Sequence, residues 1–246
     1  MGQVLKSTRT YPYLLIGNGR LARHFRHYLQ LLGIPHRHWY RQLPTPITAT
    51  LRHVEKAIVC LPDDAIADFI HCHRSLNPHI RWIHCSGSLS LPEVESAHPL
   101  MTFGSELYSR EVYESIWFIT EAGRTPFSEL LPELPNPARA IPADRKSYYH
   151  AWASLAGNFT TLLWQNYFQR LHDQLDLPPA AAEPYLRAIA TNLLTGGDPL
   201  TGPLARGDRA TIEKHRRALQ NDPFRAVYDI FVEIYSTLDK PRGSQS

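Results

Sequence analysis

The feature that most constrains the fold of this chain is the motif G-x-G-x-x-A, formed by Gly17, Gly19 and Ala22. The apolar run YPYLLIG before it predicts a strand, and RLARHFRHYLQLLG after it has apolar residues at helical spacing. At such a junction the first glycine permits a tight turn, the second lets a pyrophosphate approach the backbone, and the small third residue lets helix and strand pack closely. The motif therefore predicts a dinucleotide-binding turn, and an ordinary glycine turn is the alternative.

The rest of the first half also alternates strands and helices, with Asp63 and Asp64 opening a helix. Such alternation favours a parallel sheet with crossover helices. We therefore expect an α/β protein with an N-terminal Rossmann-type parallel sheet followed by an all-helical C-terminal domain. The further strands are predicted at IPHRHWYR, EKAIVCLP, IRWIHCSG and SIWFIT, with ARAIP at the edge.

A proline-rich stretch, PELPNPARAIP, ends the sheet domain at Pro142. Beyond it, residues 143–175 form one long amphipathic pattern that predicts a long helix. We therefore expect two domains, residues 1–142 and 143–246. Three further helices are predicted at AAAEPYLRAIATNLL, from Asp208 onward, and at DPFRAVYDIFVEIYSTL.

Charge and composition limit the classes of partner and the compartment. The formal net charge is only +3 and the basic residues are scattered, so we expect neither nucleic acid nor a membrane surface as partner. Cys60, Cys72 and Cys85 have the spacing of neither a zinc knuckle nor a disulfide framework. The N-terminus has no apolar signal core, and Lys6 stands where a myristoylation signal needs Ser or Thr. These features predict a soluble cytoplasmic protein.

The second strand ends with the residues that would select the cofactor. Arg37 and Arg41 stand there without a nearby acid, and an arginine can accept the 2′-phosphate of NADP. The alternative is a solvated arginine at a strand end. The sequence predicts an NADP(H) site formed by Gly17, Asn18, Gly19, Arg20, Leu21, Ala22, Arg37, Arg41, Leu61, Pro62 and Ser86.

Two segments, HCSGSLS (84–90) and SAHPLMTFG (96–104), are typical of site loops near the carboxyl ends of strands. We expect Ser86, Gly87, Ser88 and His98 to contact substrate, with Thr102 as a weaker option. The triplet HCH at 71–73 makes a poor chelate because neighbours on a helix point in different directions, so no metal site is expected.

The segments HCSGSLS, HPLMTF, YYHAWASLAGNF and LTGPLARGDRATIEKHRRAL resemble bacterial Rossmann-like proteins whose second domain is of unknown function. The resemblance runs from about Leu14 to Tyr235. It lies within the superfamily of pyrroline-5-carboxylate reductase, 3-hydroxyacid dehydrogenase and ketopantoate reductase, with a helical domain like that of 6-phosphogluconate dehydrogenase. It implies an NADP-dependent oxidoreductase acting on a small keto or imino acid, and a homodimer. Its sharpest implication is ketopantoate reduction in pantothenate synthesis; a pyrroline-5-carboxylate-type imine reductase is the alternative.

The resemblance also implies that the loop TGPLARGD binds the substrate carboxylate. The residues agree, because Asp208 is a good N-cap, Thr211 lies in the first turn, and Arg206 beside a helix N-terminus can bind an anion. The alternative is a well-capped turn between helices with a surface arginine.

Hydride transfer to a carbonyl needs a donor for the developing negative charge. His150 and Asn158 lie eight residues apart on the long helix and so on similar faces, and His98 is a further candidate. Related dehydrogenases place a catalytic Lys one turn before a helix Asn. If Asn158 matches that Asn, Ser154 stands in place of the Lys, which leaves His150, His98 or a shifted Lys146 as proton donor.

Three hypotheses follow from these features. The first is an NADPH-dependent reductase, with Arg206 on the carboxylate, a histidine as proton donor and Asn158 orienting the substrate. The second is a cofactor-binding sensor or scaffold without turnover, which the missing lysine favours. The third is a metal-dependent hydrolase built on the histidines and cysteines.

Overall fold

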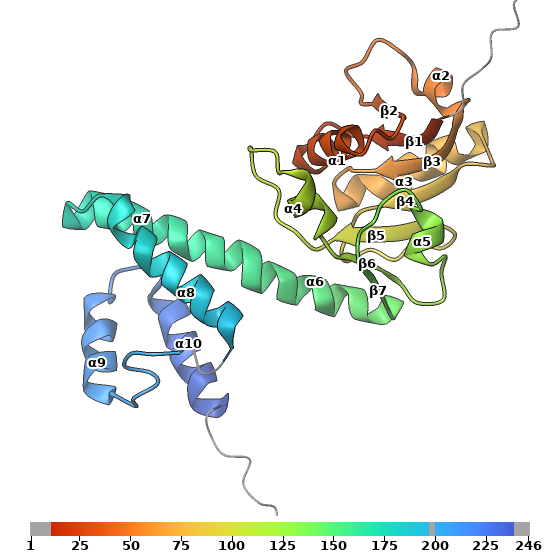
Figure 1. Cartoon of the computed structure of the whole chain (residues 1–246). Helices are drawn as coiled ribbons and strands as arrows, with labels where there is room; N and C mark the ends of the chain where they lie inside the picture. The colour runs from red at the N-terminus through yellow and green to blue at the C-terminus, as the bar shows by residue number, and fades with distance from the viewer. Residues whose placement is uncertain (1–10, 197–199, 239–246) are drawn as a thin grey trace, which may run out of the picture. The chain divides into compact units, whose positions relative to one another are not determined.

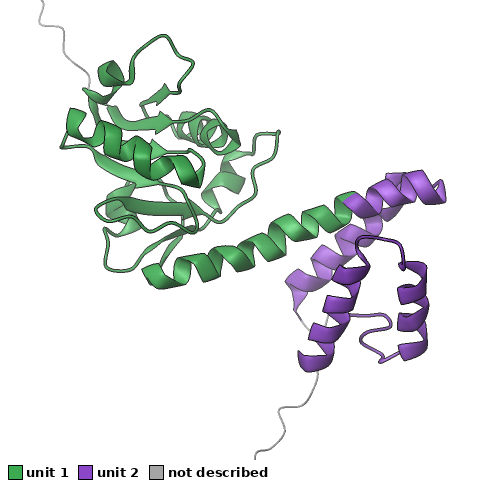
Figure 2. Cartoon of the chain, turned by 180° about the vertical axis from the view of Figure 1, so that it is seen from behind, with its two compact units in different colours: residues 1–165 green, residues 166–246 purple. Residues whose placement is uncertain are grey.

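The computed structural model describes residues 11–196 and 200–238 of the chain. The segment around Lys6, with the expectation that no targeting signal stands there, lies outside the described residues. The chain divides into two compact units after Gln165 (Figure 2). This division falls later than the change from strands to helices at Pro142, because the first part of the long helix contacts the sheet.

The first unit is built on a seven-stranded sheet with the order β2-β1-β3-β4-β5-β6-β7 (Figure 1). Neighbours from β2 to β5 are parallel, β6 is antiparallel to β5, and β7 is parallel to β6. This arrangement confirms the predicted fold class. The strands are β1 (Tyr11–Ile16), β2 (His36–Trp39), β3 (Val54–Val59), β4 (Arg81–His84), β5 (Glu95–Pro99), β6 (Phe118–Glu121) and β7 (Ala138–Ile141).

Both faces of the central strands are buried. On β1, Tyr13 and Leu15 pack into one core with Phe25 and Leu29, whereas Leu14 and Ile16 pack into the other. Each such apolar side chain contributes about 2 kcal/mol by leaving water, which is why these strands are continuously apolar. The helices of this unit are α1 (Arg20–Leu31), α2 (Ile47–Leu51), α3 (Asp63–His73), α4 (Arg110–Glu114), α5 (Phe127–Leu130) and α6 (Lys146–Ser154), with 3-10 turns at Arg74–Leu76 and Ala143–Arg145.

One segment differs from the sequence expectation. Part of SAHPLMTFG, expected to be a loop throughout, belongs to the strand β5, and only the residues after Pro99 form a loop. The strand carries polar residues and a proline, which are unfavourable in isolation. It forms because β4 pairs with one edge and β6 with the other.

The predicted helices of the second half are confirmed. α6 continues through a π-helical segment, Leu155–Phe159, into α7 (Thr160–Leu175). The remaining helices are α8 (Glu183–Thr195), α9 (Arg209–Ala218) and α10 (Arg225–Leu238), with a 3-10 turn at Pro179–Ala182. Within the second unit, Arg170 makes a two-pronged ion pair with Asp222 at 2.9–3.1 Å, which joins α7 to the segment before α10. No described helix has both the length and the apolar character that a membrane crossing needs.

Candidate functional site

The glycine turn after β1 is fixed by its neighbours. Gly17 has φ 121°, and a Cβ there would lie 2.4 Å from the Cys60 carbonyl oxygen, so only glycine fits. His38 donates from Nε2 to the Gly17 carbonyl at 2.7 Å. Gly19, the N-cap of α1, has open space where a Cβ would be. The first amides of α1 thus follow a rigid turn with room for an anionic group.

A pocket of about 290 Å³ adjoins this turn. Arg41 lines it, as do four of the predicted cofactor residues, whereas Arg37 does not. The guanidinium of Arg37 donates to the carbonyls of Ala49 and Thr50 at 3.2 and 3.4 Å and lies over the ring of Tyr11. The structure therefore brings one of the two arginines to the turn. The lining residues are Gly17, Asn18, Gly19, Trp39, Tyr40, Arg41, Gln42, Leu61 and Phe69.

The remaining predicted cofactor residues lie close by in sequence and fold. Arg20, Leu21 and Ala22 form the first turn of α1, and Ala22 is fully buried. Pro62 is the N-cap of α3. Their contact with a nucleotide stays a prediction.

The turn after β4 is held by Asp63, the first residue of α3. Ser86 and Ser88 both donate from their hydroxyls to Asp63 Oδ2, at 2.7 and 3.0 Å. The Ser86 hydroxyl oxygen also accepts from the backbone N–H groups of Ser88 and Leu89. Ser86 is therefore engaged in shaping the turn, and its role toward substrate or cofactor stays a prediction.

Gly87, in the same turn, makes room for two imidazoles. A Cβ there would lie 2.3 Å from His150 Cδ2 and 3.0 Å from His98 Nε2. The two histidine rings meet edge to face, with centroids 5.4 Å apart. His98 Nδ1 is 2.8 Å from the Tyr149 hydroxyl. The structure thus brings together three predicted site residues, Gly87, His98 and His150, and adds Tyr149.

The titration of this group follows from its burial. Burial lowers the pKa of His98 to about 4, with His150 and Lys146 adding repulsion. Burial also raises the pKa of Tyr149 to about 12. At neutral pH His98 is therefore a neutral imidazole bonded to a protonated phenol. Such a ring donates a hydrogen bond through its single N–H, but it is a weak acid. A role for His98 toward substrate, whether as proton donor or as hydrogen-bond donor, stays a prediction.

A second pocket, of about 370 Å³, opens beside the histidines. It unites the three predicted catalytic residues His98, His150 and Asn158. The π-helical segment supplies its wall on the helix side, and the loop after β5 supplies the opposite wall. The lining residues are His98, Leu100, Met101, Thr102, His150, Ala153, Ser154, Ala156, Gly157 and Asn158.

Lys146, the alternative proton donor, lies at the start of α6 with its ammonium bonded to three acceptors. Its ammonium is 1% exposed and donates to Glu121 Oε1 at 2.9 Å, to Ser96 Oγ at 2.6 Å and to the Leu89 carbonyl. An ammonium has three N–H bonds, and all are used. Burial lowers the pKa of Lys146 while the Glu121 carboxylate opposes that change. Lys146 therefore anchors α6 to the sheet, and Tyr149 and His150 lie one turn further along that helix.

The loop before α9 belongs to the second unit. Asp208 is the N-cap, as predicted, and accepts from the backbone N–H of Thr211 at 3.0 Å and from its hydroxyl at 2.7 Å. These bonds, the backbone one first, lower the pKa of Asp208. Gly202 and Gly207 both have positive φ, and Arg206 is exposed. Binding of a carboxylate by Arg206, Asp208 and Thr211 stays a prediction.

Within the described parts of the chain, no group of three or more His, Cys, Asp or Glu side chains could hold a metal ion.

Comparisons with known proteins bear on the fold and on the second half of the chain. A family model described as a domain of unknown function, DUF2520, matches residues 118–234, which include the predicted TGPLARGD loop. No curated protein matches the chain. The fold is shared with a Bacteroides fragilis protein that has been assigned as an NADP oxidoreductase (21% identity, covering 94% of this chain and 100% of that one, TM-score 0.74).

Two further solved structures share the fold. One is a Thermotoga maritima protein whose name states no function (22% identity, covering 92% and 97% of the two chains, TM-score 0.65). The other is the pyrroline carboxylate reductase of Plasmodium falciparum with NADP bound (10% identity, covering 93% and 96%, TM-score 0.58). These likenesses establish a Rossmann-like fold with a helical second half.

Proposed function

We propose that this protein is an NADP(H)-dependent oxidoreductase that reduces a small 2-keto or imino acid. One observation carries the proposal: the glycine-turn pocket and the histidine pocket both lie at the carboxyl ends of the parallel strands of one sheet. In open α/β sheets, ligands bind along that edge. The bound nucleotides named for several structures of the same fold support the choice of cofactor.

The residues of the glycine-turn pocket fit an NADP molecule. Gly19 leaves space beside the free amides of α1, which suits a pyrophosphate, and Arg41 offers a cation for a 2′-phosphate. Bound NADPH would supply a hydride.

The histidine pocket fits the polar group of a substrate. With the Tyr149 hydroxyl donating to Nδ1, the single N–H of His98 lies on Nε2 and would donate a hydrogen bond to the substrate oxygen or nitrogen. Asn158 would orient the substrate from the π-helical segment. His150 lines the same pocket and is the candidate for moving a proton. Reduction of an imine or a ketone needs this combination of a neutral donor and a proton source.

The first experiment is a substrate panel with purified protein. NADPH oxidation is followed with ketopantoate, pyrroline-5-carboxylate and other small keto and imino acids, with NADH in parallel. We expect turnover with NADPH on at least one member. Turnover with ketopantoate would support the specific assignment to pantothenate synthesis. NADPH binding without any turnover would overturn the reductase proposal and leave a cofactor-binding sensor.

Arg37 in β2 and Arg41, which follows that strand, provide a matched test of the cofactor assignment. Arg41→Ala should weaken NADPH binding about tenfold, equal to ~1.4 kcal/mol, and leave NADH binding unchanged. Arg37→Ala should change neither affinity, because Arg37 is bonded to carbonyls outside the pocket. Calorimetric titration measures both. A lost NADPH preference in the Arg37 variant alone would refute the role given to Arg41.

A further inference from the structure

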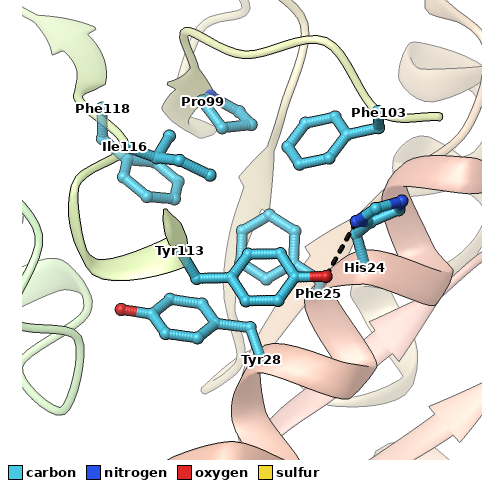
Figure 3. A pocket seen from close by; sticks show the side chains of 8 residues that line it. All are labelled: His24, Phe25, Tyr28, Pro99, Phe103, Tyr113, Ile116 and Phe118. Carbon is cyan, nitrogen blue, oxygen red and sulfur yellow. Dashed lines mark hydrogen bonds between the residues drawn. The ribbon is translucent and has the colours of Figure 1, made fainter. Parts of the chain in front are cut away.

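His24 joins the helix of the glycine turn to the loop after β5. It lies in α1, five residues beyond the N-cap Gly19, and is 1% exposed. Its Nε2 is 3.1 Å from the Gly104 carbonyl and its Nδ1 is 2.8 Å from the Tyr113 hydroxyl. A carbonyl only accepts, so Nε2 carries the proton, and Tyr113 donates to Nδ1 of the neutral ring. Figure 3 shows the bond between His24 and Tyr113.

The loop held by His24 is further fixed by two tyrosines. The Tyr108 hydroxyl donates to the Thr102 carbonyl at 2.6 Å, and the Tyr108 N–H donates to the Tyr113 hydroxyl at 3.2 Å. The ring of Phe103 packs on His24, with centroids 4.9 Å apart. The loop backbone is thus held at residue 102 and at Gly104.

The contact between α1 and this loop is close-packed. The space left among the side chains is only about 10 Å³, too small for an organic ligand. A displacement of α1 would therefore displace the loop after β5 as well, because tightly packed groups transmit strain. The residues around this space are His24, Phe25, Tyr28, Pro99, Phe103, Tyr113, Ile116 and Phe118 (Figure 3).

The same loop forms a wall of the histidine pocket, through Leu100, Met101 and Thr102. We propose that His24 is a positioning residue that couples the two pockets: a nucleotide held at the start of α1 steadies the loop wall of the substrate pocket through the His24–Gly104 bond. This inference rests on the proposed function. Bound nucleotide would then strengthen substrate binding, and bound substrate would strengthen nucleotide binding by the same factor.

Two substitutions separate the two bonds of His24. The amide nitrogen of Gln reaches the place of Nε2 and can keep the bond to Gly104, whereas the amide oxygen of Asn reaches only the place of Nδ1 and can keep the bond from Tyr113. Hydrogen–deuterium exchange of the segment 100–108, with and without saturating NADPH, reads out the loop. We expect NADPH to slow exchange at least fivefold in the wild type and in His24→Gln, and to have no effect in His24→Asn.

Binding and kinetics supply the second readout. NADPH affinity should stay within twofold in both variants, because His24 does not line the nucleotide pocket. With the substrate found by the panel, His24→Asn should raise KM at least tenfold and change kcat less than threefold. His24→Gln should leave KM close to the wild-type value. His27→Gln is the matched control, since its ring also lies near Tyr113, at 5.9 Å, and it should behave as wild type.

The possible outcomes distinguish failure of the His24 coupling from failure of the proposed reductase function. If the wild type binds no NADPH, the proposed function fails and the coupling with it. If NADPH binds but leaves loop exchange unchanged, or if His24→Asn matches the wild type, the coupling alone is overturned. Should His24→Asn not fold, Tyr113→Phe gives the complementary test, because it removes the bond to His24 Nδ1 and leaves the His24–Gly104 bond in place. We expect NADPH still to slow exchange of the segment 100–108 at least fivefold in this variant, and loss of that effect would contradict the role given to the His24–Gly104 bond.

Discussion

The two pockets at the sheet edge are built in different ways. The glycine-turn pocket combines a local backbone turn, Gly17 to Gly19 before the first amides of α1, with side chains that follow β2 and β3 and with one from α3. The histidine pocket is made from side chains on β5, the loop after it and α6, elements about fifty residues apart in sequence. The glycine turn at the base of the first pocket therefore depends on local conformation, whereas the second pocket depends wholly on long-range packing.

The largest expected effect tests the glycine turn. Gly17→Ala should lower the free energy of unfolding by about 3 kcal/mol or more, because φ is 121° and the methyl group would meet the Cys60 carbonyl at 2.4 Å. Gly19→Ala should lower the free energy of unfolding by only about 1 kcal/mol, the cost of a poorer N-cap residue, because its methyl group would contact no other atom. It should instead weaken NADPH binding at least tenfold by filling the space for the pyrophosphate.

Urea unfolding and NADPH titration of both variants make the comparison. Equal stability of Gly17→Ala and Gly19→Ala would show that the turn is not held as rigidly as its geometry indicates.

The next effect tests the side-chain pocket. Gly87→Ala should lower kcat/KM about 100-fold, because its methyl must displace the ring of His150 or His98. NADPH affinity should stay within twofold, since Gly87 does not line the nucleotide pocket. Steady-state kinetics on the panel substrate and NADPH titration check this. An equal loss in kcat/KM and in NADPH affinity would mean that the two pockets are not separate.

The smallest expected effect is a pH dependence of stability, which arises from the titration of a buried side chain, His84. Burial lowers the pKa of the fully buried His84 to about 4, against about 6.5 in the unfolded chain. Below pH 6.5 the unfolded state binds more protons, so stability falls as the pH falls. Between pH 7 and pH 5.5 His84 should account for about 1 kcal/mol of that loss. Burial of His98 acts in the same direction.

Urea unfolding at the two pH values measures this loss. In His84→Asn the amide oxygen can accept from the Ser86 N–H, as His84 Nδ1 does in the protein. The variant should lose about 1 kcal/mol of the pH dependence. An unchanged pH slope would refute the burial of a neutral ring at this position.

The same contrast decides what could be predicted from the sequence. The glycine turn and α1 were predictable because Gly17, Gly19 and Ala22 act on their own neighbourhood. His98, His150 and Asn158 were identified by chemical type and spacing, and the structure places them around one pocket. Tyr149 and the Glu121–Lys146 pair left no local signal, since their partners are 51 and 25 residues away. β5 was missed for the same reason, because its pairing comes from strands on both sides.

The π-helical segment Leu155–Phe159 has a consequence for how this protein changes over evolutionary time. In a regular α-helix, residues eight apart such as His150 and Asn158 are offset by about 80° around the axis. A π turn accommodates one extra residue and reduces that offset, so that both side chains line one pocket. Deletion of one residue there would turn Asn158 by about 100° while leaving His150 in place. The composition of this pocket is thus sensitive to helix length as well as to residue identity, so a single insertion or deletion in the helix would change which side chains line it.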